Sequence, residues 1–414
     1  MPTIKPSKPS KRPRLLEAFH KTSPSDTESL NLLFDDFNLP CLKQSPLRPD
    51  CDLGDRLKSW TPINARITLD DKGSPTNLGE EDLLRIKEVL DEAYATNTRN
   101  VYGTGLFTFH FFCDLKNVSE EHRAPVNRTV LAAFIAFLIG TYGGSAIRNY
   151  VYGIRAWHII HGIPWVINKH EVKTLFDAGN KLAPQDLKKK AKEPWTIEYL
   201  EEICKALVPN DPKDAAILAC LTTAFWGAAR LGEVTIPNLN AFKPSIHVKR
   251  SNVKLVETDR SGCSQTTIFL PWTKAAKENG EEISWAKQDG ITDPSAAFEN
   301  HLKVNNPPPD AHLFSHKHGK SMRPMTRLIF LNRIHKIVAE RNMEKLPGHG
   351  IRVGATLEYL LRGIPFDVVK TKGRWKSEAF RSYLRKHAQI LAPYMQAKPK
   401  PYDTFVRYAM PPVR

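Results

Sequence analysis

Five side chains in the C-terminal half of the chain have the types and order that chemistry on a phosphate group requires. Arg230 stands three positions before Glu233, Lys274 follows a run of β-forming residues, and His349 stands three positions before Arg352. Guanidinium groups bind phosphate oxygens as fixed, bidentate donors. An imidazole exchanges protons near neutral pH, and an ammonium donates them. Taken singly, each residue is more often part of a solvated surface, so the prediction depends on their combined order and spacing.

A tyrosine completes this set. Tyr383 lies between Arg381 and Arg385, after the segment Gly373-Arg374-Trp375. A phenol has a pKa near 10, so it needs a proton acceptor or a cationic setting to act as a nucleophile at neutral pH. The arginines and the histidine together would supply that setting.

The elements that must position these residues begin at Trp195, with Thr196 as the predicted N-cap of the first helix. An apolar helix is predicted next, and then short β-type runs with polar turns, which indicate a small antiparallel sheet. The predicted segments are a helix at 215–228, the β region at 246–285, helices at 293–304 and 325–344, and short helices at 352–361, 366–372 and 377–386.

An earlier part of the chain has helical periodicity from Leu83 to Ala183 and predicts a four-helix bundle. The helices are expected at 83–93, 98–113, 130–142 and 147–160, with Thr129 as an N-cap and Gly140 as a stop. Arginines at these helix starts are candidates for gripping DNA phosphates or for a solvated helix face. These arginines are Arg99, Arg148 and Arg155.

The composition divides the chain into five parts. Residues 1–78 are rich in proline, serine and charge and predict a disordered tail. A helical domain at 79–183, a linker at 184–194, a catalytic domain at 195–396 and a C-terminal tail at 397–414 follow. The first tail holds a basic cluster that would be a nuclear-import signal, a DNA-touching arm or simply a solvated tail. Its residues are Lys8, Lys11, Arg12 and Arg14.

Charge and cysteine usage narrow the function class. The formal net charge is +16 and the pI is about 9.5, which favours a polyanionic partner, above all nucleic acid. The six cysteines show no zinc-binding spacing, which fits a reducing compartment. No apolar run is long enough to span a membrane, and no secretory signal peptide is expected.

The ordered set of motifs resembles the catalytic domain of the tyrosine recombinases, also called the phage-integrase family. That family has an Arg with a nearby Glu, a Lys on a β-hairpin, a His-x-x-Arg pair, a His or Trp, and then the Tyr. Arg230 with Glu233, Lys274, the pair His349 and Arg352, and finally Tyr383 match these elements in order. The segment from Gly373 to Arg385 looks most like recombinases of eukaryotic mobile elements, of the Crypton and DIRS type. The helical bundle resembles the core-binding domain of the family.

Two positions leave alternatives open. The His/Trp element falls on Trp375 by residue type, or on Arg374 by its distance to the Tyr. An indole can donate a hydrogen bond and pack against a phosphate cavity, which favours Trp375. Lys277 lies close to Lys274 and is the second candidate for the hairpin lysine.

The resemblance implies a mainly α fold with a small antiparallel sheet, and DNA strand breakage and rejoining through a 3′-phosphotyrosine. It implies no metal and no cofactor, double-stranded DNA as partner, a homotetramer on paired sites, no membrane and no small-molecule substrate. The chain would act in the nucleus as a site-specific recombinase or integrase. The alternatives are a type IB topoisomerase and a catalytically inactive, domesticated DNA-binding protein.

Overall fold

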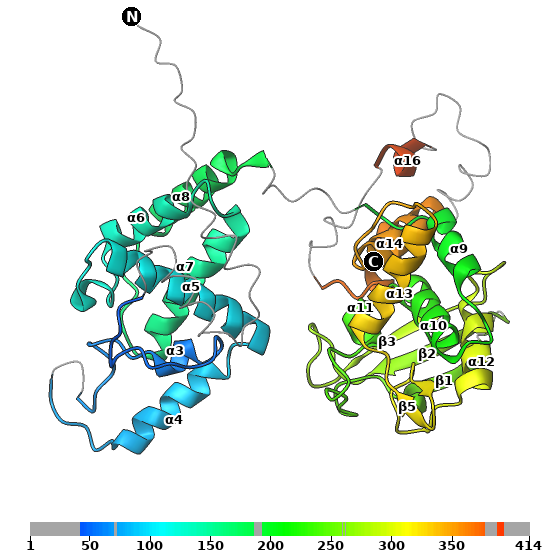
Figure 1. Ribbon diagram of the computed structural model, residues 1–414, viewed down its shortest axis with the longest axis horizontal. Helices are drawn as coiled ribbons and strands as arrows, with labels where there is room; N and C mark the ends of the chain where they lie inside the picture. Colours follow the sequence, from blue (N-terminus) through cyan, green and yellow to red (C-terminus); the bar gives the residue numbers. More distant parts are fainter. Residues whose placement is uncertain are drawn as a thin grey trace, which may run out of the picture. The chain divides into compact units, whose positions relative to one another are not determined.

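The computed structural model describes residues 42–69, 73–185, 193–258, 260, 262–376 and 387–392 (Figure 1). The chain divides into two compact units, residues 1–190 and 191–414. The division falls within the proline-bracketed segment 184–194. Each unit has its own cluster of buried apolar residues.

The first unit is helical (Figure 1). Two of its helices, Thr96–Leu115 and Gly144–Ile160, cross closely, because at each contact a glycine of one helix faces the backbone of the other. A Cβ on Gly105 would lie 2.5 Å from Tyr150 Cα, and one on Gly153 would lie 2.6 Å from the Tyr102 carbonyl oxygen. The elements are α3 (Arg56–Ser59), α4 (Glu80–Asp91), α5 (Thr96–Leu115), η1 (Glu120–His122), α6 (Arg128–Leu138), α7 (Gly144–Ile160) and α8 (Lys169–Leu182).

The prediction of a disordered tail over residues 1–78 is wrong for residues 42–69, which pack against the first unit. Leu57 and Trp60 are buried in its core, and the Trp60 carbonyl accepts a hydrogen bond from Trp157 Nε1 at 2.6 Å. Arg48 is also buried and pairs with Glu120 at 2.5 Å. A few large apolar anchors and the ion pairs of the buried Arg48, with Glu120 and Asp114, hold a segment whose composition is polar. Residues 1–41, including the basic cluster, lie outside the described residues.

The second unit combines helices with two small antiparallel sheets (Figure 1). The larger sheet has the order β1-β2-β3, and Thr267 on β2 lies opposite Ser284 on β3. The elements are α9 (Ile197–Ala206), α10 (Pro212–Trp226), α11 (Leu231–Val234), η3 (Arg250–Asn252), β1 (Val253–Thr258), β2 (Ser264–Leu270), β3 (Glu281–Trp285), α12 (Pro294–Asn305), β4 (His316–His318), β5 (Ser321–Arg323), α13 (Arg327–Glu340), α14 (Gly350–Leu361), α15 (Phe366–Lys372) and α16 (His387–Leu391).

Helix α10 is the centre of the second unit. Its residues from Asp214 to Trp226 are all buried, and it packs against α12 and α14. Such burial on all sides explains why its sequence is apolar all round rather than on one face. Within the described part of the chain, no helix has the length and apolarity needed to cross a membrane.

The predicted fold class, mainly α with a small antiparallel sheet, is confirmed. Thr196 caps α9 as predicted, through a hydrogen bond from Tyr199 N. The predicted cap Thr129 is wrong, because the Asn127 side chain accepts from the amides of Thr129 and Val130 instead. Helix α8 and the β4–β5 hairpin were not separately predicted. The predicted helix at 377–386 lies outside the described residues.

Candidate active site

Arg230 and Glu233 form the start of the site, at the short helix α11. Arg230 is the N-cap residue, and its backbone N–H donates to Glu233 Oε2 at 2.8 Å. Its guanidinium also donates to Glu233 Oε1 at 2.8 Å. The Arg230 side chain is 31% exposed whereas that of Glu233 is 6% exposed, so the carboxylate anchors a guanidinium that still reaches solvent.

Arg374 joins this pair to the three-stranded sheet. It donates to Glu233 at 2.6 Å and to Glu281, the first residue of β3, at 3.3 Å. The Arg374 side chain is only 8% exposed. Its backbone has φ +58°, a left-handed conformation that is uncommon outside glycine. Two carboxylates therefore hold a buried guanidinium on an unfavourable backbone, so Arg374 ties the site together rather than standing ready for a ligand.

The loop between β2 and β3 is fixed to the same network. Thr273 is fully buried and donates to Glu281 Oε2 at 2.6 Å. Its hydroxyl oxygen also accepts from the backbone N–H of Ala276 at 3.0 Å. The next residue, Lys274, is exposed, and so is Lys277. Both candidate lysines therefore lie on this hairpin loop, and Lys274 is the one adjacent to the anchor.

Arg352 lies under the turn that follows α15. It is 1% exposed and donates through Nη2 to the carbonyl of Gly373. Its guanidinium carbon lies 4.3 Å from the centre of the Trp375 ring. That ring covers Gly373 so closely that any side chain there would collide with it, because a Cβ would lie 1.5 Å from a ring carbon. His349 is the N-cap residue of α14, one turn before Arg352, and is half-buried.

Five consecutive residues, 372–376, each contact a part of this site. Lys372 donates to the Ser284 carbonyl on β3 at 2.8 Å, and Lys376 donates to the Ala275 carbonyl in the β2–β3 loop at 3.0 Å. Gly373, Arg374 and Trp375 make the contacts described above. The segment thus gathers α11, α14, β3 and the lysine-bearing loop. Tyr383, seven positions further on, lies outside the described residues.

Burial and ion pairing shift two pKa values here. Burial raises the pKa of Glu233, but its contacts with Arg374 and Arg230 outweigh burial and bring that pKa below its ordinary value. The pKa of Lys372 is lowered to about 8, first by burial and then by the nearby charge of Arg374. Because its pKa is lowered, Glu233 is ionised at neutral pH. Lys372 also lies 5.1 Å from the centre of the Tyr359 ring.

Three residues of the network were not predicted. Glu281 and Lys372 carry no motif signal, since each is a charged residue at the end of an element. Thr273 is a small polar residue directly before Lys274, and its type alone does not mark it as an anchor. Their roles come from tertiary contacts, those of Glu281 with Thr273 and Arg374 and that of Lys372 with the Ser284 carbonyl, and such contacts leave no pattern in the sequence.

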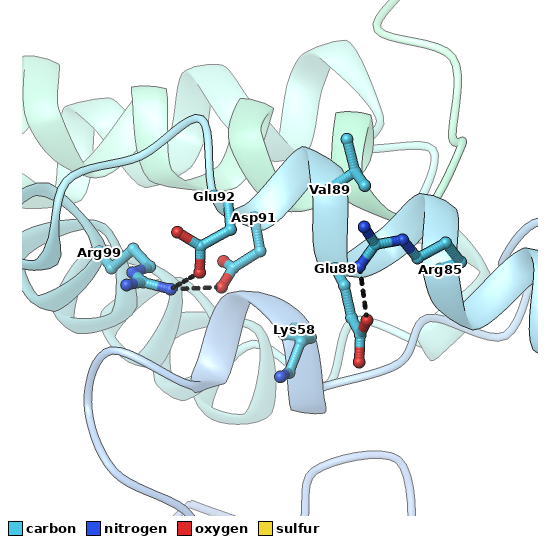
Figure 2. Close-up of a pocket in the computed structure, with 7 residues that line it drawn as sticks. All are labelled: Lys58, Arg85, Glu88, Val89, Asp91, Glu92 and Arg99. Atoms are coloured by element: carbon cyan, nitrogen blue, oxygen red, sulfur yellow. Dashed lines mark hydrogen bonds and ion pairs between the residues drawn. The ribbon is translucent and has the colours of Figure 1, made fainter. Parts of the chain in front are cut away.

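The predicted DNA-binding arginines of the first unit differ in their surroundings. Arg99, near the start of α5, lines a pocket of about 470 Å³ together with residues of α3 and α4, and there it pairs with Asp91 at 2.7 Å and with Glu92 at 3.6 Å (Figure 2). Arg148 and Arg155 lie on the exposed side of α7, two turns apart. The predicted catalytic residues do not line this pocket.

In the described ranges, no group of three or more His, Cys, Asp or Glu residues could hold a metal ion.

Comparison with known proteins gives matches among solved structures but none among family models or curated proteins. No model of a known protein family matches the chain, and no curated protein matches it. A post-cleavage complex of the XerH site-specific recombinase with a palindromic difH substrate matches with a TM-score of 0.50 and 12% identity, over 83% of this chain and 93% of that one. The Tn1549 transposon integrase in complex with circular-intermediate DNA gives 0.46 and 12%, over 75% and 99%.

The XerH match spans both units of this chain. The finer resemblance to Crypton and DIRS-type recombinases stays a prediction. The helical unit followed by a helical unit with a small antiparallel sheet gives this chain the fold of the tyrosine recombinases.

Proposed function

We propose that this chain breaks and rejoins DNA strands through a covalent 3′-phosphotyrosine at Tyr383, as a site-specific recombinase or integrase. The observation that supports this most directly is the network Arg230–Glu233–Arg374–Glu281–Thr273. This network fixes the positions of the partly exposed Arg230 guanidinium and of the loop that carries Lys274. Preorganised cations of this kind stabilise charge that develops on a phosphate in the transition state.

Each residue has a distinct role in the proposed reaction. The Tyr383 oxygen attacks the scissile phosphorus and loses its proton, and the bond from phosphorus to the 5′-oxygen breaks. Arg230 and Arg352 bind the nonbridging oxygens, while His349 takes up the phenolic proton or bonds the phosphate. Lys274 donates a proton to the leaving 5′-oxygen. Attack of a 5′-hydroxyl on the phosphotyrosine then reseals a strand, so the number of phosphodiester bonds is conserved without ATP.

Trp375 is proposed to fill the His/Trp position, and Arg374 to support it. The Trp375 ring packs on the Arg352 guanidinium, which fixes the orientation of that cation. Arg374 is engaged by two carboxylates, so its charge is balanced locally. Both observations favour Trp375 as the residue that borders the phosphate.

The partner and assembly are proposals of the same kind. We expect double-stranded DNA to be bound by the exposed Arg148 and Arg155 as well as by the active site, and two pairs of subunits to act on paired sites. The basic cluster of the N-terminal tail is a candidate nuclear-import signal, so we expect the protein to act in the nucleus. Its residues are Lys8, Lys11, Arg12 and Arg14. The matched XerH recombinase is bound to its difH substrate, which agrees with a DNA partner for this chain.

A nicked suicide substrate tests the chemistry. The parent chain should form a covalent adduct whose DNA-linked peptide contains Tyr383. Tyr383→Phe should bind DNA with unchanged affinity and form no adduct. Arg230→Ala should cut cleavage by orders of magnitude, because removing one preorganised charge typically costs about 3–4 kcal/mol.

The outcomes separate the alternatives. An adduct that survives in Tyr383→Phe would refute the nucleophile assignment. DNA binding by the parent chain with no adduct would favour the domesticated DNA-binding protein. Relaxation of supercoiled plasmid without strand exchange would favour a type IB topoisomerase.

A further inference from the structure

The chain enters the second unit against helix α14. The boundary between the two units follows residue 190, and the described part of the chain resumes at Glu193. Pro194 and Trp195 are the first described residues of this unit that are buried, and Trp195 belongs to its apolar core. The Trp195 backbone N–H donates to the Gly350 carbonyl, in the first turn of α14, at 3.1 Å. We call residues 193–195 the entry segment.

Two glycines of α14 allow the entry segment to lie directly on the helix backbone. A Cβ on Gly354 would lie 2.0 Å from the Trp195 carbonyl oxygen, and one on Gly350 would lie 2.8 Å from the Glu193 carbonyl oxygen. A side chain at either position would therefore push the entry segment away. Because the contact joins two backbones without a flexible side chain between them, a shift of one displaces the other.

Arg352 lies on the opposite side of the same turns of α14. Gly350 and Gly354 are about one turn apart and share a face of the helix, whereas Arg352, midway between them, points away from that face. On its own side, Arg352 donates to the Gly373 carbonyl and packs on the Trp375 ring, 4.3 Å from the ring centre. The helix that carries this guanidinium is thus held between the entry segment and the turn at Trp375.

The indole of Trp195 anchors the entry segment. It is 1% exposed and meets the Tyr199 ring edge-on, with 4.9 Å between the ring centres. The Tyr199 hydroxyl donates in turn to the Glu344 carbonyl, beyond the end of α13, at 2.9 Å. The buried Trp195 Nε1 has no hydrogen-bond partner among the described residues. The indole therefore anchors the segment by packing rather than by hydrogen bonding.

We propose that Trp195 is a positioning residue for DNA cleavage. With the entry segment it fixes α14 from behind, and so sets where the Arg352 guanidinium meets the scissile phosphate. This inference deepens the proposed function and rests on the role given to Arg352 there. Such support matters because a misplacement of about 1 Å, even from a change far from the chemistry, can cost about 100-fold in rate.

A charged and a neutral substrate separate positioning from a general loss of structure. Gly354→Ala, which forces the Trp195 carbonyl away from α14, is compared with Gly179→Ala in α8, where a Cβ would make an ordinary contact at 3.4 Å. On the nicked suicide substrate, Gly354→Ala should cut adduct formation about 100-fold. A methylphosphonate at the scissile position lacks one nonbridging charge, so the arginine has less charge to stabilise and the defect should be much smaller. Gly179→Ala should match the parent chain on both substrates.

Two substitutions of Trp195 form the second comparison. Trp195→Ala should reproduce the substrate pattern of Gly354→Ala, whereas Trp195→Phe keeps a packing ring and should retain cleavage. Circular dichroism shows whether each variant is folded. An equal defect of Gly354→Ala on the charged and the neutral substrate would overturn the positioning role. Normal cleavage by both Gly354→Ala and Trp195→Ala would overturn it as well.

Binding without cleavage separates this inference from the proposed chemistry. In the Tyr383→Phe background, the chain should bind the phosphodiester duplex more tightly than the methylphosphonate duplex, and Gly354→Ala should remove that preference. If the parent chain forms no adduct but Gly354→Ala removes the preference, the proposed chemistry fails and the positioning role stands. A preference that survives in Gly354→Ala overturns the positioning role. If the parent chain forms no adduct and its Tyr383→Phe form shows no preference, both fail.

Discussion

The guanidinium of Arg374 donates to the Glu233 carboxylate across 2.6 Å, joining residues 141 positions apart in the chain. Both side chains are more than nine-tenths buried. A second carboxylate, that of Glu281, reaches the same guanidinium from β3. Two largely buried carboxylates therefore share one arginine, and among the described residues Arg230 is the only other cation that pairs with Glu233.

Arg374→Met should strongly destabilise the fold. Removal of one partner from a buried ion pair leaves an uncompensated charge and typically costs about 3–5 kcal/mol. Urea denaturation should show this loss in the free energy of unfolding. The control Arg230→Met should cost less, since that side chain is about one-third exposed and Glu233 keeps Arg374. Equal losses in the two variants would contradict the structural role assigned to Arg374.

Thr273→Val should reduce DNA cleavage more than it reduces stability. Valine has the shape of threonine but can neither donate to Glu281 nor accept from Ala276 N. The loop that carries Lys274 would then lose its anchor while the sheet keeps its core. Thr273→Ser retains the hydroxyl and should restore cleavage on the suicide substrate. If Thr273→Ser is as impaired as Thr273→Val, packing of the methyl group rather than the hydrogen bonds explains the effect.

The sequence predicted the helices of the second unit well because their apolar periodicity and caps are local signals. Thr196 and the helix at 366–372 are examples. The order of Arg230, Lys274 and the His349–Arg352 pair could also be read directly, since type and spacing carry it. These features do not need knowledge of the tertiary contacts.

Long-range pairings could not be predicted in this way. Nothing near Glu281 in the sequence shows that Thr273 and Arg374 both bond to it. The prediction of disorder around Leu57 and Trp60 was wrong for a related reason. The average composition of this segment is polar, but its two large apolar side chains pack into a core formed by helices distant in the sequence. Average composition underestimates such anchors because burial is decided residue by residue.

Lys274 and Lys277 can be separated by changing the leaving group. If Lys274 protonates the leaving 5′-oxygen, Lys274→Ala should cut cleavage about 100-fold or more. A substrate with sulfur in place of that oxygen releases a thiolate, whose conjugate acid has a pKa near 8.5, and needs no acid. This substrate should restore cleavage by Lys274→Ala but not by Arg230→Ala. If it instead rescues Lys277→Ala alone, the proton donor is Lys277.

Arg99 and Arg155 should respond differently to alanine substitution. Arg99→Ala removes the partner of Asp91, which is buried, so it should lower the free energy of unfolding by about 1–3 kcal/mol. It should leave the salt dependence of DNA binding unchanged. Arg155→Ala should leave stability unchanged and lower the magnitude of that slope by about 0.9. Stability and binding are measured on the same preparations, and a reduced slope in Arg99→Ala would show that this pocket also meets DNA.

The free energy of unfolding should increase as the pH rises above about 8, because Lys372 then loses its proton in the folded state. Its pKa is about 8 in the folded chain and about 10.4 in an unfolded one. Between these values the unfolded state holds a proton that the folded state has released, so stability increases with pH. Below pH 8 both states are charged, and the penalty for burying the ammonium is fully present.

The gain across this window should be on the order of 3 kcal/mol at most. Lys372→Met should lack this rise, whereas the exposed control Lys336→Met should keep it. Urea denaturation at pH values from about 7 to about 10 measures all three chains. Parallel curves for the parent chain and Lys372→Met would mean that the buried ammonium keeps an ordinary pKa, held by the Ser284 carbonyl and the Tyr359 ring.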